Sequence, residues 1–253
     1  TRAQLRFLIA LDNLYATFLM PKPRRILLKF SGEALQGSLA SGIDFSILKN
    51  LALQIIAAKK AGYQIAVVIG AGNIWRFRDQ RDSGIDRVYS DYMGMLATIM
   101  NSVALMSAIE NGGVAARVCS ALDIPSVAEP YIKRRAARHL EKGRVVICAG
   151  GTGNPYFTTD SAAALRSLEL ECDVLVKATN TDAVYSDDPK KNKKAKRYTK
   201  ISYDEVLEKD LKVMDGAAIA LCRDGQVPIQ VFRFGKKEDL IKAIEGKIGT
   251  RIG

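Results

Sequence analysis

The stretch VVICAGGTGNPYFTTDSAAALRS (145–167) joins an apolar run to an alanine-rich run through a loop of small and polar residues. Residues 145–148 are predicted to form a buried strand, and SAAALRSLELE (161–171) is predicted to form a helix. Asp160 precedes that helix, at the position where a carboxylate can cap it by accepting backbone N–H groups. A strand, a polar loop and a capped helix in this order are typical of an α/β fold.

The same alternation continues on both sides of this stretch. Further strands are predicted at 25–30, 65–69, 114–118, 174–177 and 229–232. Helices are predicted from Asp44 to Gly62, over 90–111, 131–142 and 238–245, and as two short segments after residue 200. This order predicts a three-layer αβα sandwich around a mostly parallel sheet.

Composition limits the class of protein. The chain has 253 residues, of which 48% are hydrophobic and 26% charged, so a folded globular protein is expected and disorder is not. The net charge of +11 favours anionic ligands. The lysine-rich run KKNKKAKRYTK (190–200) has no interleaved aromatic platform, so we interpret it as a solvated turn and expect no nucleic-acid binding.

Cysteine and histidine usage excludes several kinds of site. Four widely spaced cysteines form no CxxC pair, and we expect buried, reduced thiols in a cytoplasmic protein. They are Cys119, Cys148, Cys172 and Cys222. The single histidine, His139, is predicted to lie on the surface of a helix, which argues against a histidine triad or a multi-histidine metal site.

Residues 1–22 are predicted to be an extension outside the fold. Leu8, Leu11, Tyr15 and Phe18 recur at helical spacing, which allows an amphipathic helix. A docked oligomer arm is an alternative, and a secretory leader fits poorly. No apolar run of the sequence approaches the ~20 residues of a membrane-spanning helix, so we expect no membrane association.

Four loops at predicted strand ends carry the candidate chemistry. Ligands of open α/β sheets bind beyond the carboxyl ends of the strands. Lys29 emerges beside a glycine turn, GAGN (70–73) can form an anion-binding nest, and Asp187 and Asp188 can hold a divalent cation. With the hydroxyl-rich loop 151–160, these groups suit phosphoryl transfer between two bound anions.

At these loops the sequence resembles the bacterial uridylate kinases, members of the amino acid kinase superfamily, from about residue 24 to the last residue. The motifs that carry the resemblance are RILLKFSGEALQG, VVIGAGNIWR, SDYMGMLAT, GTGNPYFTTDSAAALR, KATNTDAVYSDDP and DLKVMD. The resemblance implies an amino acid kinase-like domain over 23–253, whose N-terminal half mainly binds UMP and whose C-terminal half mainly binds ATP. It implies reversible transfer of the ATP γ-phosphoryl group to UMP, giving UDP and ADP in pyrimidine nucleotide biosynthesis. It also implies Mg²⁺ dependence, a cytoplasmic homohexamer, activation by GTP and inhibition by UTP.

The resemblance also assigns residues to roles. Catalytic roles fall on Lys29, Arg76 and Asp160, of which Asp160 orients the lysine. ATP-binding roles fall on Lys29, Ser31, Gly32, Gly72, Arg76, Thr179, Asn180, Tyr185 and Asp188, and Asp188 is also the expected metal-side residue. UMP-binding roles fall on Ala71, Gly72, Asp91, Thr152, Gly153, Asn154, Pro155, Tyr156, Phe157, Thr158 and Thr159.

Three positions depart from the family pattern. Ala71 interrupts a run of three glycines, and its methyl group is tolerable only if φ is negative. Phe77 stands where glycine is common, and Asn180 stands where lysine is frequent. These departures concern affinity and regulation, not the reaction class.

Two alternatives remain. One is a kinase of the same superfamily that acts on an amino acid or a carbamate; the loop 151–160 argues against it. The other is a nucleotide-sensing or nucleic-acid-binding protein that has lost catalysis, against which stands the retention of Lys29, Asp160 and Asp188.

Overall fold

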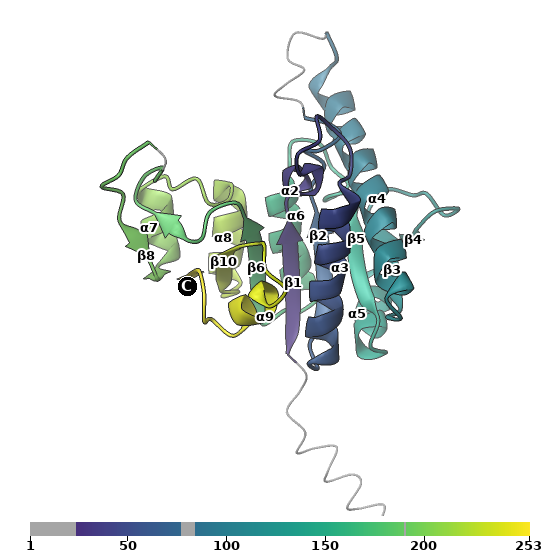
Figure 1. Ribbon diagram of the computed structural model, residues 1–253. Helices are drawn as coiled ribbons and strands as arrows, with labels where there is room; N and C mark the ends of the chain where they lie inside the picture. Colours follow the sequence, from purple (N-terminus) through teal and green to yellow (C-terminus); the bar gives the residue numbers. More distant parts are fainter. Residues whose placement is uncertain (1–23, 77–83, 190) are drawn as a thin grey trace, which may run out of the picture.

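A single large sheet organises the chain (Figure 1). The computed structural model describes residues 24–76, 84–189 and 191–253, so the expected N-terminal extension and Phe77 lie outside the described residues. Nine strands form the sheet in the order β4-β3-β5-β2-β1-β6-β10-β11-β9, and β7 and β8 form a separate antiparallel pair. The strands are β1 (Arg25–Phe30), β2 (Gln64–Ile69), β3 (Ala116–Ser120), β4 (Glu129–Pro130), β5 (Val145–Ala149), β6 (Val174–Thr179), β7 (Val184–Tyr185), β8 (Arg197–Tyr198), β9 (Lys200–Ile201), β10 (Ile229–Arg233) and β11 (Thr250–Ile252).

Helices cover both faces of the sheet, and Figure 1 shows α3 and α4 on one side of the strands and α6 on the other. The helices are α2 (Gly32–Gln36), α3 (Phe45–Lys60), α4 (Arg87–Asn111), α5 (Lys133–Glu141), α6 (Thr159–Glu169), α7 (Tyr203–Glu208), α8 (Gly216–Asp224) and α9 (Asp239–Ile244). One apolar core lies between the sheet and α3, α4 and α9, and a second lies between the sheet and α5, α6 and α8. The predicted three-layer αβα sandwich is therefore confirmed.

The alternation of side chains along β1 decides which residues reach which face. Ile26, Leu28 and Phe30 point into the core under α3, whereas Leu27 belongs to the core under α6. By the same period of two, Lys29 lies on the α6 face. This polar side chain thus leaves a largely apolar strand on the side where the loop 151–160 enters its helix.

The central strand β6 follows the same rule, and it is aligned in register with β1. Val174, Val176 and Ala178 face the α3 core, and Leu175 faces the α6 core. Lys177 is the direct partner of Lys29 in the parallel pairing of the two strands. Two lysines therefore stand side by side on one face at the carboxyl end of the sheet.

Most predicted elements are confirmed, with some shifts at their ends. The strand expected at 114–118 lies at Ala116–Ser120, and the helix expected at 131–142 is Lys133–Glu141. Asp44 caps α3 as predicted, because its Oδ1 accepts Ser46 N at 2.9 Å. The antiparallel strand β11 and the two-residue strands were not predicted, because such short segments carry no periodic signal.

The prediction for His139 is wrong. Its side chain is only 11% exposed, and its ring nitrogens lie 3.1 Å from Glu129 Oε2 and 2.9 Å from Arg144 NH1. The reason is that Ala136, His139 and Leu140 form the buried face of α5, at i, i+3 and i+4. This narrow buried stripe is hard to recognise in the sequence, because most of the residues around it are basic.

The predictions for the cysteines and the lysine run agree with the structure. All four cysteines are buried and free, and burial raises the pKa of Cys119 and Cys222 to about 12, so these thiols are unreactive. The described lysines of the run 191–200 are exposed, four of them before β8 and Lys200 in the short strand β9.

The long helix α4 is half core and half surface. Its length and mean hydropathy of 1.5 would suit a membrane span, but it packs against α3 and β5 and buries Thr98, Asn101 and Ser102. Within the predicted stripe, Ala97 is buried, whereas Leu96 and Met100 are 47% and 59% exposed. The stripe was predicted to lie in the core or in a subunit interface, and the structure divides it between core and an apolar surface.

Candidate functional site

The carboxyl ends of β1, β2, β5 and β6 meet where the four predicted loops begin. The first two loops touch closely. A Cβ atom on Gly32 would lie 2.5 Å from both Gly70 O and Gly72 N, so only glycine permits this approach. The turn that contains Lys29 and Ser31 is thereby fixed against the glycine turn after β2.

Two buried asparagines hold that glycine turn from behind. Asn101 Nδ2 donates to Gly70 O at 2.8 Å and to Asn73 Oδ1 at 2.8 Å, and Asn73 Nδ2 donates to Gly42 O at 2.9 Å. Both side chains are almost completely buried. Ala71 is not among the described non-glycine residues with positive φ, so its methyl group meets the condition stated for it.

A carboxylate lies between the two lysines. Lys29 Nζ lies 2.6 Å from Asp160 Oδ1, and Lys177 Nζ lies 2.8 Å from Asp160 Oδ2. These three side chains are 9–15% exposed. Like charges on neighbouring strands would repel, so the carboxylate of α6 allows both ammonium groups to remain near one point.

The electrostatics of this Lys29–Asp160–Lys177 cluster follow from its geometry. Burial alone would raise the pKa of Asp160, but the two ammonium groups outweigh burial and hold that pKa below its ordinary value. Burial lowers the pKa of Lys177, the charge of Asp160 opposes this effect, and the charge of Lys29 adds to it. The cluster therefore carries an ionised carboxylate between two lysines.

Asp160 does not cap α6, contrary to the prediction. The cap is Thr158, whose Oγ1 accepts Asp160 N at 3.0 Å and Ser161 N at 3.3 Å. Asp160 lies in the first turn of the helix, where both its oxygens are taken by lysines. A hydroxyl serves as cap in its place, and the carboxylate remains near the helix N-terminus, where the helix dipole favours it.

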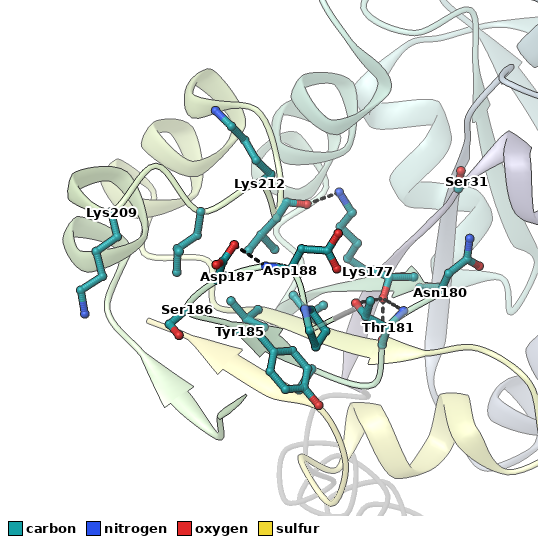
Figure 2. Close-up of a pocket in the computed structure, with 18 of the residues that line it drawn as sticks. Ser31, Lys177, Asn180, Thr181, Tyr185, Ser186, Asp187, Asp188, Lys209 and Lys212 are labelled. Atoms are coloured by element: carbon teal, nitrogen blue, oxygen red, sulfur yellow. Dashed lines mark hydrogen bonds between the residues drawn. The ribbon is translucent and has the colours of Figure 1, made fainter. Parts of the chain in front are cut away.

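Two cavities meet at Lys29. The first has a volume of about 740 Å³, and Figure 2 shows it with Lys177, Asn180 and Thr181 on one side and Lys209 and Lys212 on the other. The second has a volume of about 430 Å³. Lys29, Ser31 and Glu33 line both cavities. A group held at Lys29 can therefore be reached from either side.

The predicted residues divide between the cavities. Lys29, Ser31, Thr179, Asn180, Tyr185 and Asp188 line the first. Lys29, Ser31, Gly32, Ala71, Gly72, Arg76, Asp91, Thr152, Phe157, Thr158 and Thr159 line the second. Gly153, Asn154, Pro155 and Tyr156 line neither. Gly32 and Arg76, which were assigned to ATP and not to UMP, and Gly72, which was assigned to both, line only the second.

At the rim of the second cavity, Asp91 holds the loop 151–160 at Tyr156. Asp91 accepts Tyr156 N at 2.7 Å and Arg87 Nε at 2.8 Å, and the Arg87 guanidinium lies 5.3 Å from the centre of the Tyr156 ring. Tyr156 has φ of 70° and is 68% exposed, and Phe157 is 55% exposed. Asp91 thus holds the loop at Tyr156, where two aromatic rings remain in solvent.

Arg76 is held at the floor of the second cavity. Its NH1 lies 2.8 Å from Glu33 Oε1, and its Nε donates to Gly72 O at 2.7 Å. Glu33 was not predicted as a site residue, although it follows Gly32 directly. Its carboxylate lies at the junction of the cavities and beside the guanidinium.

Lys177 is the most important residue that the sequence reasoning missed. It was treated only as the end of a strand. A lysine inside the apolar run VLVKAT was the available signal, because a buried ammonium needs a partner. Among the described residues, no group of three or more histidine, cysteine, aspartate or glutamate side chains could hold a metal ion by itself.

Comparison with known proteins agrees with this geometry. The model of the "Amino acid kinase family" matches residues 24–233. The chain is 53% identical over 226 residues to the uridylate kinases of Zymomonas mobilis and Methylococcus capsulatus, covering 89% of this chain and 93% and 95% of those proteins. The solved UMP kinase of Bacillus anthracis superposes with a TM-score of 0.87 at 36% identity, covering 92% of this chain and 97% of that one. The chain therefore belongs to the amino acid kinase family and is related to its uridylate kinases.

Proposed function

We propose that the protein is a UMP kinase, which transfers the γ-phosphoryl group of ATP to UMP and yields UDP and ADP. The observation that carries this proposal is the meeting of two cavities at Lys29. The uridylate kinases that are 53% identical to the chain support the choice of acceptor. A role in pyrimidine nucleotide biosynthesis follows from the product.

The first cavity suits ATP and the second suits UMP. All residues that line the second cavity lie between 29 and 159, and most that line the first lie beyond 176. This division supports the assignment of the N-terminal half of the domain 23–253 mainly to UMP and the C-terminal half mainly to ATP. Thr179, Asn180 and Tyr185 are then part of the ATP wall.

The reaction needs position and positive charge more than a covalent nucleophile. A UMP phosphate oxygen, already anionic near neutral pH, forms the new bond to the γ-phosphorus. The bond from that phosphorus to the bridging oxygen of ATP breaks, and ADP leaves with the electron pair. Lys29 contacts the moving group, Lys177 approaches it from β6, and Asp160 acts as the positioning residue for both.

The glycine turn supplies further donors. Gly32, Ala71 and Gly72 line the junction side of the second cavity, where backbone N–H groups can face an anion. Ser31 offers a hydroxyl to either phosphate chain. Arg76 contacts phosphate once UMP competes with Glu33 for its guanidinium.

The loop 151–160 and Asp91 wrap UMP in this proposal. Thr152, Phe157, Thr158 and Thr159 line the second cavity and can contact the nucleotide directly. Gly153, Asn154, Pro155 and Tyr156 do not line it, so we assign them to the shape and closure of the loop.

Mg²⁺ is the proposed cofactor, and Asp188 is the proposed metal-side residue. Mg²⁺ in kinase sites uses one or two carboxylates together with substrate phosphates, so the lack of a three-carboxylate cluster among the described residues fits it. When bound, Mg²⁺ neutralises charge on the ATP phosphates. Asp188 lines the first cavity beside Asp187, whose pKa is lowered by hydrogen bonds from Asn192 and Asp188 N.

The oligomer and its regulation also remain proposals. We infer a cytoplasmic homohexamer that GTP activates and UTP inhibits. The exposed apolar side chains of α4, with Leu96 and Met100 among them, supply a surface suited to subunit contact.

A coupled assay tests the proposed function. Purified protein receives MgATP and one acceptor at a time: UMP, CMP, glutamate, aspartate or carbamate. We expect turnover to be fastest with UMP. Equal or faster turnover with another acceptor would contradict the proposal. Salt-sensitive binding to DNA of unrelated sequence, without kinase turnover, would favour the nucleic-acid alternative.

A further inference from the structure

One segment that lines the first cavity has no role in the proposed function. Residues 209–213 form a wall of the first cavity, and Val213 O accepts a hydrogen bond from Lys177 Nζ. Two residues later, Asp215 begins α8. The chain therefore passes directly from the first cavity to the start of a helix that packs on α6.

Asp215 does more than cap its own helix. Its Oδ1 accepts Ala218 N at 2.8 Å, which is the ordinary capping bond. The same oxygen accepts Ser161 Oγ at 3.0 Å, and Oδ2 accepts Thr158 Oγ1. Two hydroxyls from the first turn of another helix, more than fifty positions away in sequence, thus converge on one carboxylate.

The two hydroxyls lie on either side of Asp160. Thr158 lines the second cavity and caps α6, and Ser161 is 3% exposed in its first turn. A fixed position of this turn fixes the Asp160 carboxylate between Lys29 and Lys177. Two hydroxyls that share one carboxylate acceptor restrain the first turn of α6 relative to the start of α8.

We propose that Asp215 is a positioning residue that links the wall of the first cavity to the first turn of α6, and so sets the two lysines and the UMP loop at a fixed distance from ATP. The proposal rests on the proposed function, because it assigns a nucleotide to each cavity. Asp215 lines neither cavity, so its effect on the reaction passes through Thr158, Ser161 and Asp160.

Asp215→Asn should weaken the bonds to Thr158 and Ser161 while it keeps the cap of α8. Asparagine caps helices as well as aspartate does, but it has one acceptor oxygen and no charge. Ser202→Ala is the matched control, because Ser202 caps α7 by accepting Glu205 N at 3.1 Å and, within the described part of the chain, makes no hydrogen bond to α6. Ser161→Ala removes one hydroxyl and leaves Asp215 unchanged.

Hydrogen exchange followed by mass spectrometry tests the link without reference to activity. In the full-length protein, Asp215→Asn should speed exchange in the first turn of α6, whereas Ser202→Ala should not. Unchanged exchange there in Asp215→Asn would overturn the proposal. A wild-type protein that does not phosphorylate UMP would contradict the proposed function instead, and the exchange comparison would still decide the link.

Kinetics add a second readout. Asp215→Asn should lower kcat with UMP about tenfold, because small displacements of catalytic groups are costly, with a melting temperature near that of wild type. Adding Ser161→Ala should lower kcat by a smaller factor in the Asp215→Asn variant than in the wild type, because both substitutions act through the same hydrogen bonds. Additive losses, or an unchanged kcat in Asp215→Asn, would overturn the proposal.

Discussion

The Lys29–Asp160–Lys177 cluster and the loop at the rim of the second cavity are held in opposite ways. The cluster stands on β1, β6 and α6, and the register of two paired strands sets the two lysines side by side. The loop is held by hydrogen bonds to Asp91 and Asp215 but leaves Tyr156 and Phe157 largely exposed. The sheet therefore fixes the charges that the reaction needs, whereas the loop can adapt to the acceptor.

The largest expected effect comes from the cluster. Lys29→Ala should lower kcat by about 10³-fold, since removal of one preorganised donor to a developing charge has effects of this size. Lys133→Ala, which breaks the exposed ion pair with Glu171, is the control and should keep full activity. A kcat within threefold of wild type for Lys29→Ala would remove the lysine from its proposed role; steady-state rates and circular dichroism decide this.

Asp160→Asn should lower kcat by about 10²-fold, because both lysines lose their counter-charge and their orientation. It should also change how stability depends on pH. The folded-state pKa of Asp160 lies below its ordinary value of 3.8. An ionised Asp160 therefore stabilises the fold above about pH 4, and this contribution is lost as pH falls below 3.8 toward the lower folded-state pKa.

Urea unfolding between pH 2.5 and about 6 measures this effect, and Asp160→Asn should show a shallower loss of stability on the acid side. Asp86→Asn is a suitable control, since Asp86 is an exposed cap of α4 that accepts Val88 N at 2.8 Å, and asparagine caps equally well. An identical acid limb in wild type and Asp160→Asn would show that the carboxylate is not held ionised by the lysines.

A smaller effect, limited to UMP binding, is expected at the loop 151–160. Asp91→Ala releases Tyr156 N and Arg87, so KM for UMP should rise about tenfold while KM for ATP stays unchanged. Glu110→Ala, at the other end of α4, is the control. An equal rise in KM for UMP and KM for ATP would show that the loop at the rim affects both nucleotide sites and does not act on UMP alone.

The smallest effect is expected at the outer edge of the first cavity. Tyr185 donates its hydroxyl to Asp182 at 2.9 Å, in an exposed group that includes Arg197. Tyr185→Phe keeps the ring and removes this bond, so KM for ATP should stay within about twofold, as exposed polar pairs contribute little. A tenfold change in KM for ATP would show that residues outside the Lys29–Asp160–Lys177 cluster must also be held precisely.

The same contrast explains what could be predicted from the sequence. Apolar runs such as 25–30 and 65–69 fixed the layers, because strand and helix periods are local signals. The pairing of Lys29 with Lys177 was missed, because register between strands that are 148 residues apart is set by tertiary packing. The cap of α6 was misassigned to Asp160 because its two lysine partners lie on distant strands.

His139 was misjudged for a related reason. A helix rich in arginine and lysine still buries a face three residues wide when it packs on a sheet, and His139 lies on that face between Glu129 and Arg144. The contacts of Asp215 could not be predicted from the sequence either, because its hydroxyl partners belong to another helix. The local sequence predicts the helices and strands, whereas contacts between them determine which side chains meet at the site.

The most direct measurement is a crystal structure of the full chain with UMP and a non-hydrolysable ATP analogue bound together. The expected result places the γ-phosphate in the first cavity and the UMP phosphate in the second, both within hydrogen-bond distance of Lys29 Nζ. The attacking oxygen should lie about 3–3.5 Å from the γ-phosphorus. Two phosphates bound apart, with Lys29 touching neither or only one, would contradict the account.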